Sequence, residues 1–336
     1  MFELSFVFAG IIAFAVLAYV ILDGFDLGIG ILFPFMPEKD HRDTAMNSVA
    51  PVWDGNETWL VLGGGGLLAA FPVAYAVVMP ALYAPIIAML LALIFRGVAF
   101  EFRWRAAEHR RWLWDWSFAG GSTVAAFAQG IALGALVQGI SVSGRAYAGG
   151  WYDWLSPFSI VTGVALVTGY ALLGATWLVM KTEGSLQQRA RRFSMITGTG
   201  TLAAIGVVSL WTPLLQPVYW ERWFAWPALL FTLPVPLAVA ACAWLLYRGL
   251  VDRRRDAQPF LAALGLFVLS FIGLGISFHP FIVPPSLTIR EAAAPDVSLA
   301  FILVGTVILV PAILAYTAFA YWVFRGKVDA TGGYHH

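Results

Sequence analysis

Long apolar runs separated by short polar segments dominate the chain. Nine such runs lie near residues 6–35, 60–78, 81–100, 118–140, 160–180, 195–215, 226–247, 260–283 and 297–324. Each run is about as long as a helix that crosses ~30 Å of hydrocarbon. An open sheet would leave backbone groups unpaired in lipid, and no run alternates as barrel strands do. The pattern predicts an all-α polytopic membrane protein with nine transmembrane helices in one domain, residues 1–326, followed by a polar tail, residues 327–336.

Composition supports a membrane location. Hydrophobic residues make up 60% of the 336 residues and charged residues only 12%, against about 25% charged residues in an ordinary soluble domain. So few charges could not cover a soluble surface of this size. The net charge of +1 gives no indication of nucleic acid binding. Because all the loops are short, function is expected within the membrane or at a partner.

The basic residues predict the direction of insertion. With the N-terminus outside, 17 of the 20 Lys and Arg residues fall in cytoplasmic segments, and only Arg145, Arg222 and Arg290 fall outside. Cytoplasmic loops of membrane proteins carry an excess of Lys and Arg. We therefore expect an outside N-terminus and a cytoplasmic C-terminus.

Two pairs of acidic residues lie in or next to the apolar runs. Asp23 and Asp26 occur in LDGFDLGIG, and Asp54 and Glu57 flank Asn56 in the later WDGNET. A spacing of three places each pair on one helix face. Charged side chains inside membrane spans are costly and by default mark functional sites.

Carboxylates close together in a medium of low dielectric do not readily ionise at the same time, so we expect at least one to hold a proton at neutral pH. A series of such groups is the physical basis of a proton relay. Two structural interpretations compete with it. Asp54 could cap the helix that follows, and Asp23 and Asp26 could form structural ion pairs with Arg96 of the third span.

Other features have simpler interpretations. Arg96 and Glu101 are expected near the inner interface, where Arg96 could extend its head group to the membrane surface. The run Gly63 to Gly66 predicts close helix packing. Among the few histidines only His279 is placed where a buried ligand could lie, and no metal site is expected. His335 and His336 in the tail are weak indications of metal binding.

Five motifs in order resemble subunit II of the cytochrome bd-type quinol oxidases. They are LDGFDLGIG, NSVAPVWDGNETWL, FRGVAFEFR, WLWDWSF and HPFIVPPSLT. The compact length is similar to that of the cyanide-insensitive branch of the family. The resemblance implies a heterodimer in a bacterial cytoplasmic (inner) membrane. In such a heterodimer a haem-bearing subunit I holds haems of b-type, or of b- and d-type, together with the quinol site, and small single-span accessory subunits can be present.

This resemblance further implies that the chain binds no haem itself. The complex oxidises quinol and reduces dioxygen to water with cytoplasmic protons. A proton route would begin near Asp54, pass Glu101, which stands where some members have Asp, and continue by Asp23. The neighbouring Asp26 and Glu57 are included in this candidate pathway.

Trp53 resembles a residue that contacts a structural quinone in some members of the family. Arg96 and Asn56 are expected to act as structural partners of the acidic residues. A proton-coupled small-solute transporter and a scaffold subunit with purely structural acids are the alternative functions. Transporters usually show two matching interrupted helices, which this sequence lacks.

Overall fold

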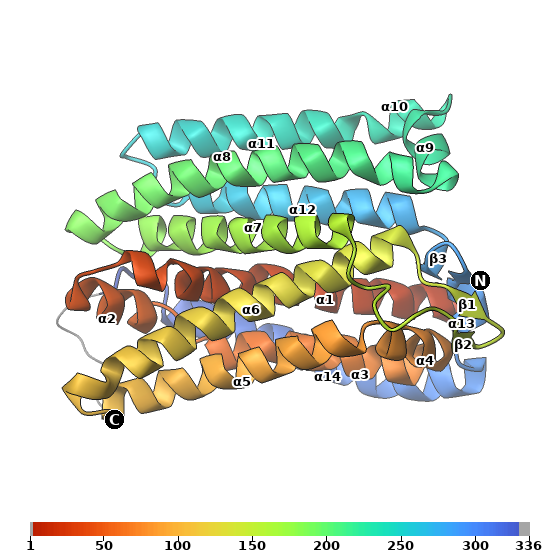
Figure 1. The fold of residues 1–336 in the computed structure, drawn as a ribbon, viewed down its shortest axis with the longest axis horizontal. Coiled ribbons are helices and arrows are strands. Elements are labelled where there is room, and N and C mark those ends of the chain that lie inside the picture. Colours follow the sequence, from red (N-terminus) through yellow and green to blue (C-terminus); the bar gives the residue numbers. More distant parts are fainter. Residues whose placement is uncertain (1–2, 329–336) are drawn as a thin grey trace.

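Long helices lying side by side form nearly the whole molecule. The computed structural model describes residues 3–328 (Figure 1). Eight helical segments of this part are long and apolar enough to cross a membrane. Their bounds are α1 (Leu4–Leu32, extended by η1, Phe33–Phe35), α5 (Tyr83–Arg105), α6 (Arg111–Gln138, preceded by η2, Glu108–Arg110), α7 (Pro157–Lys181), α8 (Gly184–Leu215), α10 (Ala228–Thr232) with α11 (Pro234–Val251), α12 (Gln258–Phe278) and α14 (Asp296–Val323). The all-α polytopic class is confirmed.

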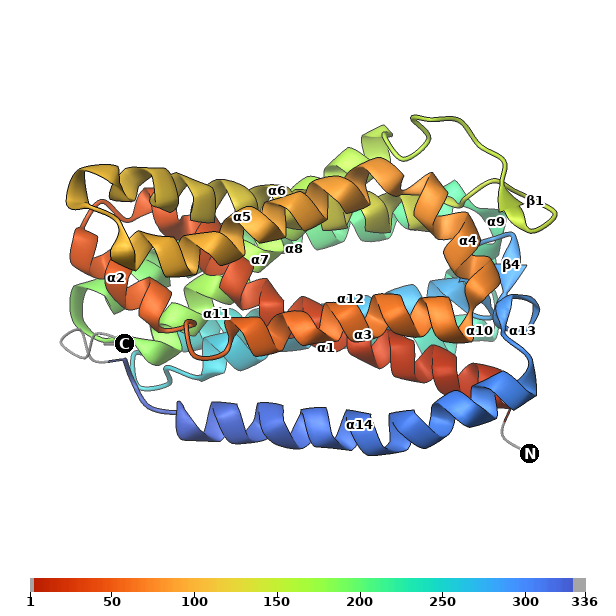
Figure 2. The ribbon, with the colours of Figure 1, turned by 90° about the horizontal axis from the view of Figure 1, so that it is seen from below.

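The second predicted span is divided into two helices. α3 (Trp53–Ala70) ends at Phe71, and α4 (Pro72–Ala81) begins at the next residue. Phe71 has φ −133° and ψ 62°, outside the helical region, because a residue that precedes proline is sterically disfavoured from helical geometry. The polar first turns of α3 explain why it is not among the eight apolar segments. The second predicted run therefore corresponds to the α3–α4 pair, and α3 lies between α5 and α14 in the view of Figure 2.

Short elements close the two ends of the bundle. α2 (Lys39–Asn47) lies at the end where α5, α7 and α11 finish (Figure 1). The hairpin β1 (Val142–Ser143) with β2 (Ala146–Tyr147), the hairpin β3 (Phe281–Val283) with β4 (Leu287–Thr288), α9 (Pro217–Phe224) and α13 (Ile289–Ala292) lie at the other end. The basic loops thus share the end that contains α2.

Glycine allows α1 and α7 to meet at backbone contact. A Cβ atom added at Gly28 would lie 1.8 Å from the carbonyl oxygen of Tyr170. One added at Gly174 would lie 2.4 Å from the carbonyl carbon of Gly28. Small residues at helix interfaces permit such an approach. Gly28 and Gly174 thus form a backbone contact between α1 and α7.

The glycine run of α3 packs less closely than predicted. An added Cβ at Gly63 or Gly66 would reach α1 side chains at 3.4 and 3.3 Å. At Gly64 and Gly65 it would meet nothing within 4 Å in the described part of the chain. The prediction of close packing was therefore wrong for the middle of this run, because consecutive residues of a helix point in different directions and only part of the run can face α1.

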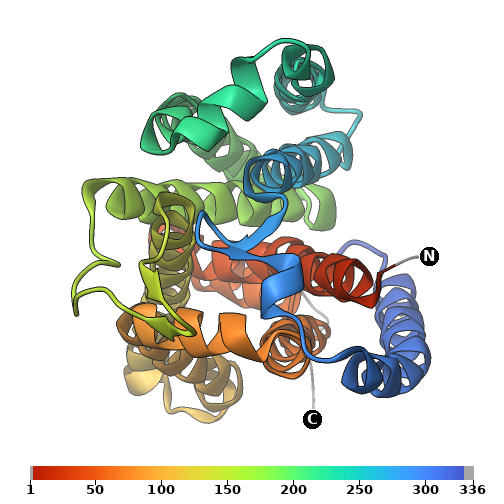
Figure 3. The same ribbon diagram turned by 90° about the vertical axis from the view of Figure 1, so that its right-hand side faces the viewer.

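α14 lies at the edge of the bundle, beside α1 and α3 (Figures 2 and 3). Most of its large apolar side chains are exposed; Val297 is 84% and Phe301 is 83% exposed. Polar contacts instead hold its C-terminal end. The Nζ of Lys181 donates to the carbonyl oxygen of Phe324, and the backbone N–H of Val328 donates to that of Lys181 over 2.8 Å.

Lys327 makes further polar contacts, which reach the loop between α11 and α12. Its Nζ donates to the Thr182 carbonyl over 3.0 Å and contacts Oδ2 of Asp256 at 2.6 Å, while Arg191 contacts Oδ1 of Asp256 at 2.7 Å. Partial burial opposes ionisation of Asp256, but the hydrogen bond and charge of Lys327 hold its pKa below the ordinary value. The first residues of the predicted tail therefore pack on the bundle. Residues 329–336, with His335 and His336, lie outside the described residues.

Replacing Gly28 by Ala should destabilise the bundle, because the new methyl group would overlap the Tyr170 carbonyl. Overpacking of this kind costs about 1–3 kcal/mol or more. Gly64→Ala is the matched control, since its methyl group meets no atom. Thermal unfolding of the detergent-purified protein measures both variants. Equal melting temperatures for the two would contradict the proposed backbone contact.

Candidate functional site

Two aspartates of α1 lie completely inside the bundle. Asp23 and Asp26 have 0% exposed side chains. Asp23 lies nine residues before Leu32, about 14 Å from the end of the helix at 1.5 Å per residue. Their spacing of three residues puts both carboxylates on one face of α1. α3 and α5 supply the side chains that these carboxylates meet.

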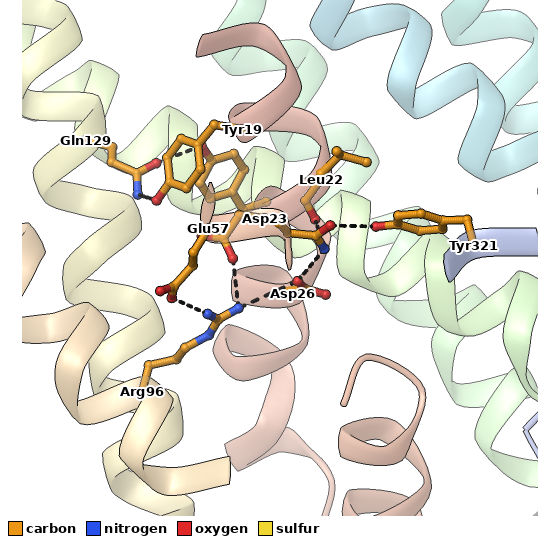
Figure 4. A network of polar contacts seen from close by, with 10 residues as sticks. Tyr19, Leu22, Asp23, Asp26, Glu57, Arg96, Gln129 and Tyr321 are labelled. Atoms are coloured by element: carbon orange, nitrogen blue, oxygen red, sulfur yellow. Dashed lines mark hydrogen bonds and ion pairs between the residues drawn. The ribbon is translucent and has the colours of Figure 1, made fainter. Parts of the chain in front are cut away.

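Arg96 of α5 lies between three carboxylates (Figure 4). Its Nη2 is 2.8 Å from Oδ1 of Asp23 and 3.6 Å from Oδ2 of Asp26, and its Nη1 is 2.5 Å from Oε1 of Glu57. The Arg96 side chain is 0% exposed and that of Glu57 is 29% exposed. The prediction that Arg96 extends to the membrane surface was wrong, because these partners hold its head group in the interior.

Asn56 of α3 donates a hydrogen bond to the Asp26 carboxylate. Its Nδ2 donates to Oδ2 of Asp26 over 2.8 Å and to the carbonyl oxygen of Leu22 over 3.2 Å. Its Oδ1 accepts from the hydroxyl of Tyr321 over 2.9 Å. Tyr321 belongs to α14, so this amide connects the buried carboxylates to the helix at the edge of the bundle (Figure 4).

Two aromatic rings cover the Arg96 guanidinium. Trp53 and Phe100 stack with centroids 4.8 Å apart and planes 4° from parallel. The Cζ of Arg96 lies 5.3 Å from the Trp53 ring and 5.4 Å from that of Phe100. Such contacts stabilise a cation more strongly when it is desolvated. Within this chain, Trp53 thus contacts both Phe100 and the Arg96 guanidinium.

The charges of the cluster do not balance. Asp23, Asp26 and Glu57 would carry three negative charges if ionised, against one positive charge on Arg96. A buried charge without compensation is strongly unfavourable. Within the described residues, Oδ2 of Asp23 and Oδ1 of Asp26 are also buried without a hydrogen-bond partner. The arrangement is suited to holding protons on its carboxylates and exchanging them.

The structure does not place Asp54 or Glu101 in this cluster. Asp54 is exposed in the first turn of α3, where Val52 is the N-cap and no side chain caps the helix, so capping by Asp54 is not observed. The Glu101 side chain is 66% exposed and contacts Arg105 at 3.6 Å. Both acids lie toward the end of the bundle that contains α2.

A second ionic cluster at that end was missed by the sequence analysis. Arg103 is 1% exposed and contacts Asp43 at 2.7 Å and Asp115 at 2.5 Å. Arg42 contacts the other oxygen of Asp115 at 3.2 Å. These contacts tie α2, α5 and α6 together. Oppositely charged residues in adjoining segments were the available signal, but the pattern does not show which charges pair.

Three polar residues next to Asp23 were also missed. Gln129 of α6 donates through Nε2 to the Tyr19 hydroxyl over 2.8 Å, and the Tyr170 hydroxyl donates to Gln129 Oε1 over 2.8 Å. Tyr19 lies one helical turn before Asp23 on α1. That spacing, and a glutamine within an apolar span, were signals that could have found them.

The histidines of the described chain do not form a haem site. His41 pairs with Ser185 at 2.9 Å, His109 is exposed in η2, and His279 ends α12 beside the Phe6 ring. None of these three imidazoles lies within the bundle. Between residues 3 and 328 no group of three or more His, Cys, Asp or Glu side chains could hold a metal ion. A haem with two histidine ligands therefore does not fit the residues present.

Fold and site together define a polytopic helical membrane protein with an ionisable cluster buried between its helices. The family model described as cytochrome bd terminal oxidase subunit II matches residues 4–324, and the chain belongs to this family.

Relatives and a solved structure agree with this assignment. The chain is 31% identical to cytochrome bd-I ubiquinol oxidase subunit 2 of Escherichia coli (strain K12), covering 97% of this chain and 95% of that protein. It is 29% identical to cytochrome bd ubiquinol oxidase subunit 2 of Bacillus subtilis (strain 168), covering 95% of each. The structure of bd oxidase from Geobacillus thermodenitrificans contains a chain that matches with a TM-score of 0.73 at 18% identity, covering 96% of this chain and 99% of that one.

The chain is thus a multi-pass membrane subunit of a terminal quinol oxidase, a quinol:oxygen oxidoreductase complex, and it has a partner oxidase subunit. The alternative of a proton-coupled solute transporter is not favoured.

Removing the Arg96 charge should destabilise the protein strongly. Arg96→Met would leave three carboxylates, two of them fully buried, without their cation. Breaking a buried ion pair costs about 3–5 kcal/mol. Arg105→Met on the same helix is the control, because its side chain is 80% exposed and surface changes usually stay within about 0.5 kcal/mol. Thermal unfolding in detergent compares the two. A small effect of Arg96→Met would show that the cluster does not depend on its guanidinium.

Proposed function

We propose that this subunit conducts protons from the cytoplasm toward the oxygen-reducing haem of its partner and supports assembly of the complex. The observation that carries the proposal is the gathering of three carboxylates, two of them fully buried, around one buried guanidinium. A structural ion pair needs one acid for each base. The excess of acids over bases supports a site whose carboxylates take up and release protons.

The proposed route begins at the end of the bundle that contains α2. Asp54 is exposed there, and Glu57 follows three residues later on α3, with 29% of its side chain exposed. Glu57 is therefore the member of the cluster that can meet water. Arg96 contacts both Glu57 and Asp23, and Asp23 and Asp26 are the buried members of the route. Glu101 is a second exposed acid near the same end and is proposed as part of the entrance.

The electron-transfer chemistry is proposed to take place in the partner subunit. This chain lacks an imidazole pair within the described bundle, which supports haems, either b-type or b- and d-type, held by subunit I. Quinol oxidation and dioxygen reduction then require no catalytic residue of this chain. Trp53 is half-buried with Phe100 stacked on its ring. A structural quinone in this subunit would have to contact the remaining surface of Trp53.

The proposed location is a bacterial cytoplasmic (inner) membrane with the N-terminus outside and the C-terminus inside. The shared position of the basic loops at one end of the bundle supports this orientation, because such loops stay on the cytoplasmic side. Exposed apolar side chains such as Leu210 of α8 (76%) and Phe301 of α14 (83%) support contacts with lipid, subunit I and small single-span accessory subunits.

Asp23→Asn should give an assembled, haem-loaded but slow oxidase. The amide keeps the shape and can still pair by hydrogen bonds, but it cannot carry a proton. Loss of a positioned proton-transfer group lowers rates by roughly 10²-fold. Oxygen consumption driven by a quinol, with the haem absorption spectrum of the purified complex, measures turnover and assembly separately. Glu221→Gln on exposed α9 is the control and should retain full turnover. Unchanged turnover in Asp23→Asn would rule out the relay.

Asp54→Asn tests the entrance of the route. A relay predicts slower oxygen consumption with unchanged haem content, because the exposed acid supplies protons to Glu57. A scaffold whose acids are only structural predicts either unchanged turnover or loss of the complex. The same two measurements distinguish these outcomes, and Glu101→Gln provides a second entrance variant.

A further inference from the structure

We propose that Gln129 is a positioning residue for Asp23 and acts through Tyr19. This inference rests on the proposed proton route, since it concerns one of its carboxylates. Tyr19 and Tyr170 are buried, and Gln129 is half-buried between them. The three side chains come from α1, α7 and α6, and Tyr19 and Gln129 lie on the side of Asp23 away from Tyr321 (Figure 4).

The hydrogen bonds of these residues run in one direction. The Tyr170 hydroxyl donates to Oε1 of Gln129, and Nε2 of Gln129 donates to the Tyr19 oxygen, both over 2.8 Å. An amide has its acceptor and its donors on different atoms. Because the Tyr19 oxygen accepts from Gln129, the hydrogen of Tyr19 is left for another acceptor. Asp23 lies four residues along the same face of α1, and its buried Oδ2 has no hydrogen-bond partner within the described residues, so we infer that it is the acceptor for this hydrogen.

Burial of Asp23 explains why this direction matters. Nη2 of Arg96 donates to Oδ1 of Asp23, whereas Oδ2 is buried without a hydrogen-bond partner within the described residues. If the Gln129 amide were reversed, Tyr19 would donate to Gln129, and its hydrogen would no longer be available to Oδ2 of Asp23. A buried acceptor without a donor is costly. The amide therefore sets which way the Tyr19 hydroxyl points and, through it, the orientation of the carboxylate.

Packing fixes Tyr170, the first donor in this series of hydrogen bonds. A Cβ added at Gly24 of α1 would lie 2.8 Å from the Tyr170 ring, and Phe267 of α12 stacks on that ring with centroids 5.9 Å apart. The backbone of Tyr170 is held against Gly28. Tyr170 thus has little freedom to rotate, and its hydroxyl gives Gln129 a fixed partner.

The test uses the purified oxidase complex with Gln129→Leu, Tyr19→Phe and the combination of each with Asp23→Asn. Gln129→Leu should lower the maximal rate of quinol-driven oxygen consumption by roughly three- to tenfold, as expected for one net hydrogen bond. The KM for quinol and the haem content should not change. Thr123→Val, which removes a hydroxyl of α6 bonded only to its own helix, is the control and should retain the wild-type rate.

The double variants separate positioning from a general packing role. If Gln129 acts through Asp23, then Gln129→Leu should have no further effect once Asp23 is Asn, because coupled sites are not additive. If the double variant is slower than Asp23→Asn by the full Gln129→Leu factor, the positioning role is overturned while the relay stands. Wild-type turnover in Asp23→Asn would instead overturn the relay. Should Gln129→Leu fail to assemble, Tyr19→Phe must show the same loss and the same lack of additivity.

Discussion

One buried guanidinium holds the centre of this molecule together. Arg96 contacts acids on α1 and α3 from its own helix α5, so three helices must meet at one depth for the charges to be compensated. Buried ionic networks are stable only when their members are paired and hydrogen-bonded. Trp53 and Phe100 cover the cation, and Asn56 completes Asp26. These neutral residues thus supply the contacts and hydrogen bonds that the buried charges require.

Small residues make this meeting of helices geometrically feasible. Gly28 and Gly174 bring α1 and α7 to backbone contact beside the cluster. On the other side, an added Cβ at Gly121 of α6 would lie 2.6 Å from the Ala92 carbonyl oxygen and 2.9 Å from the backbone nitrogen of Arg96. The backbone that carries the guanidinium is therefore held by a close helix contact. These close helix contacts limit how far the helices, and with them the charged side chains of the cluster, can move apart.

The sequence predicted much of the fold, because hydrophobic run length reports directly on membrane spans. It also placed Asp23, Asp26, Asn56, Glu57 and Arg96 in or beside the spans. It did not predict the break at Phe71, and it left open whether Arg96 reaches the membrane surface or pairs with Asp23 and Asp26. The pairing of Asp23 with Arg96 joins residues 73 positions apart, and periodicity within one helix does not show which neighbour a face will meet. Gln129 escaped notice for the same reason, since its partners lie on α1 and α7.

The positions of the acids also explain why the cluster needs such support whereas Asp54 and Glu101 do not. A charge near the end of a span can reach water or head groups, while a charge in the middle is costly unless it is paired. Asp23 and Asp26 therefore have ion-pair and hydrogen-bond partners on several helices. One contact, that of Tyr321 through Asn56, comes from α14, a helix with little apolar burial in this chain. Polar contacts, namely this one and those of Lys181 and Lys327, thus hold the C-terminal end of α14 and the residues just after it. Whatever covers the exposed face of α14 in the assembled complex therefore bears on the geometry around Asp26.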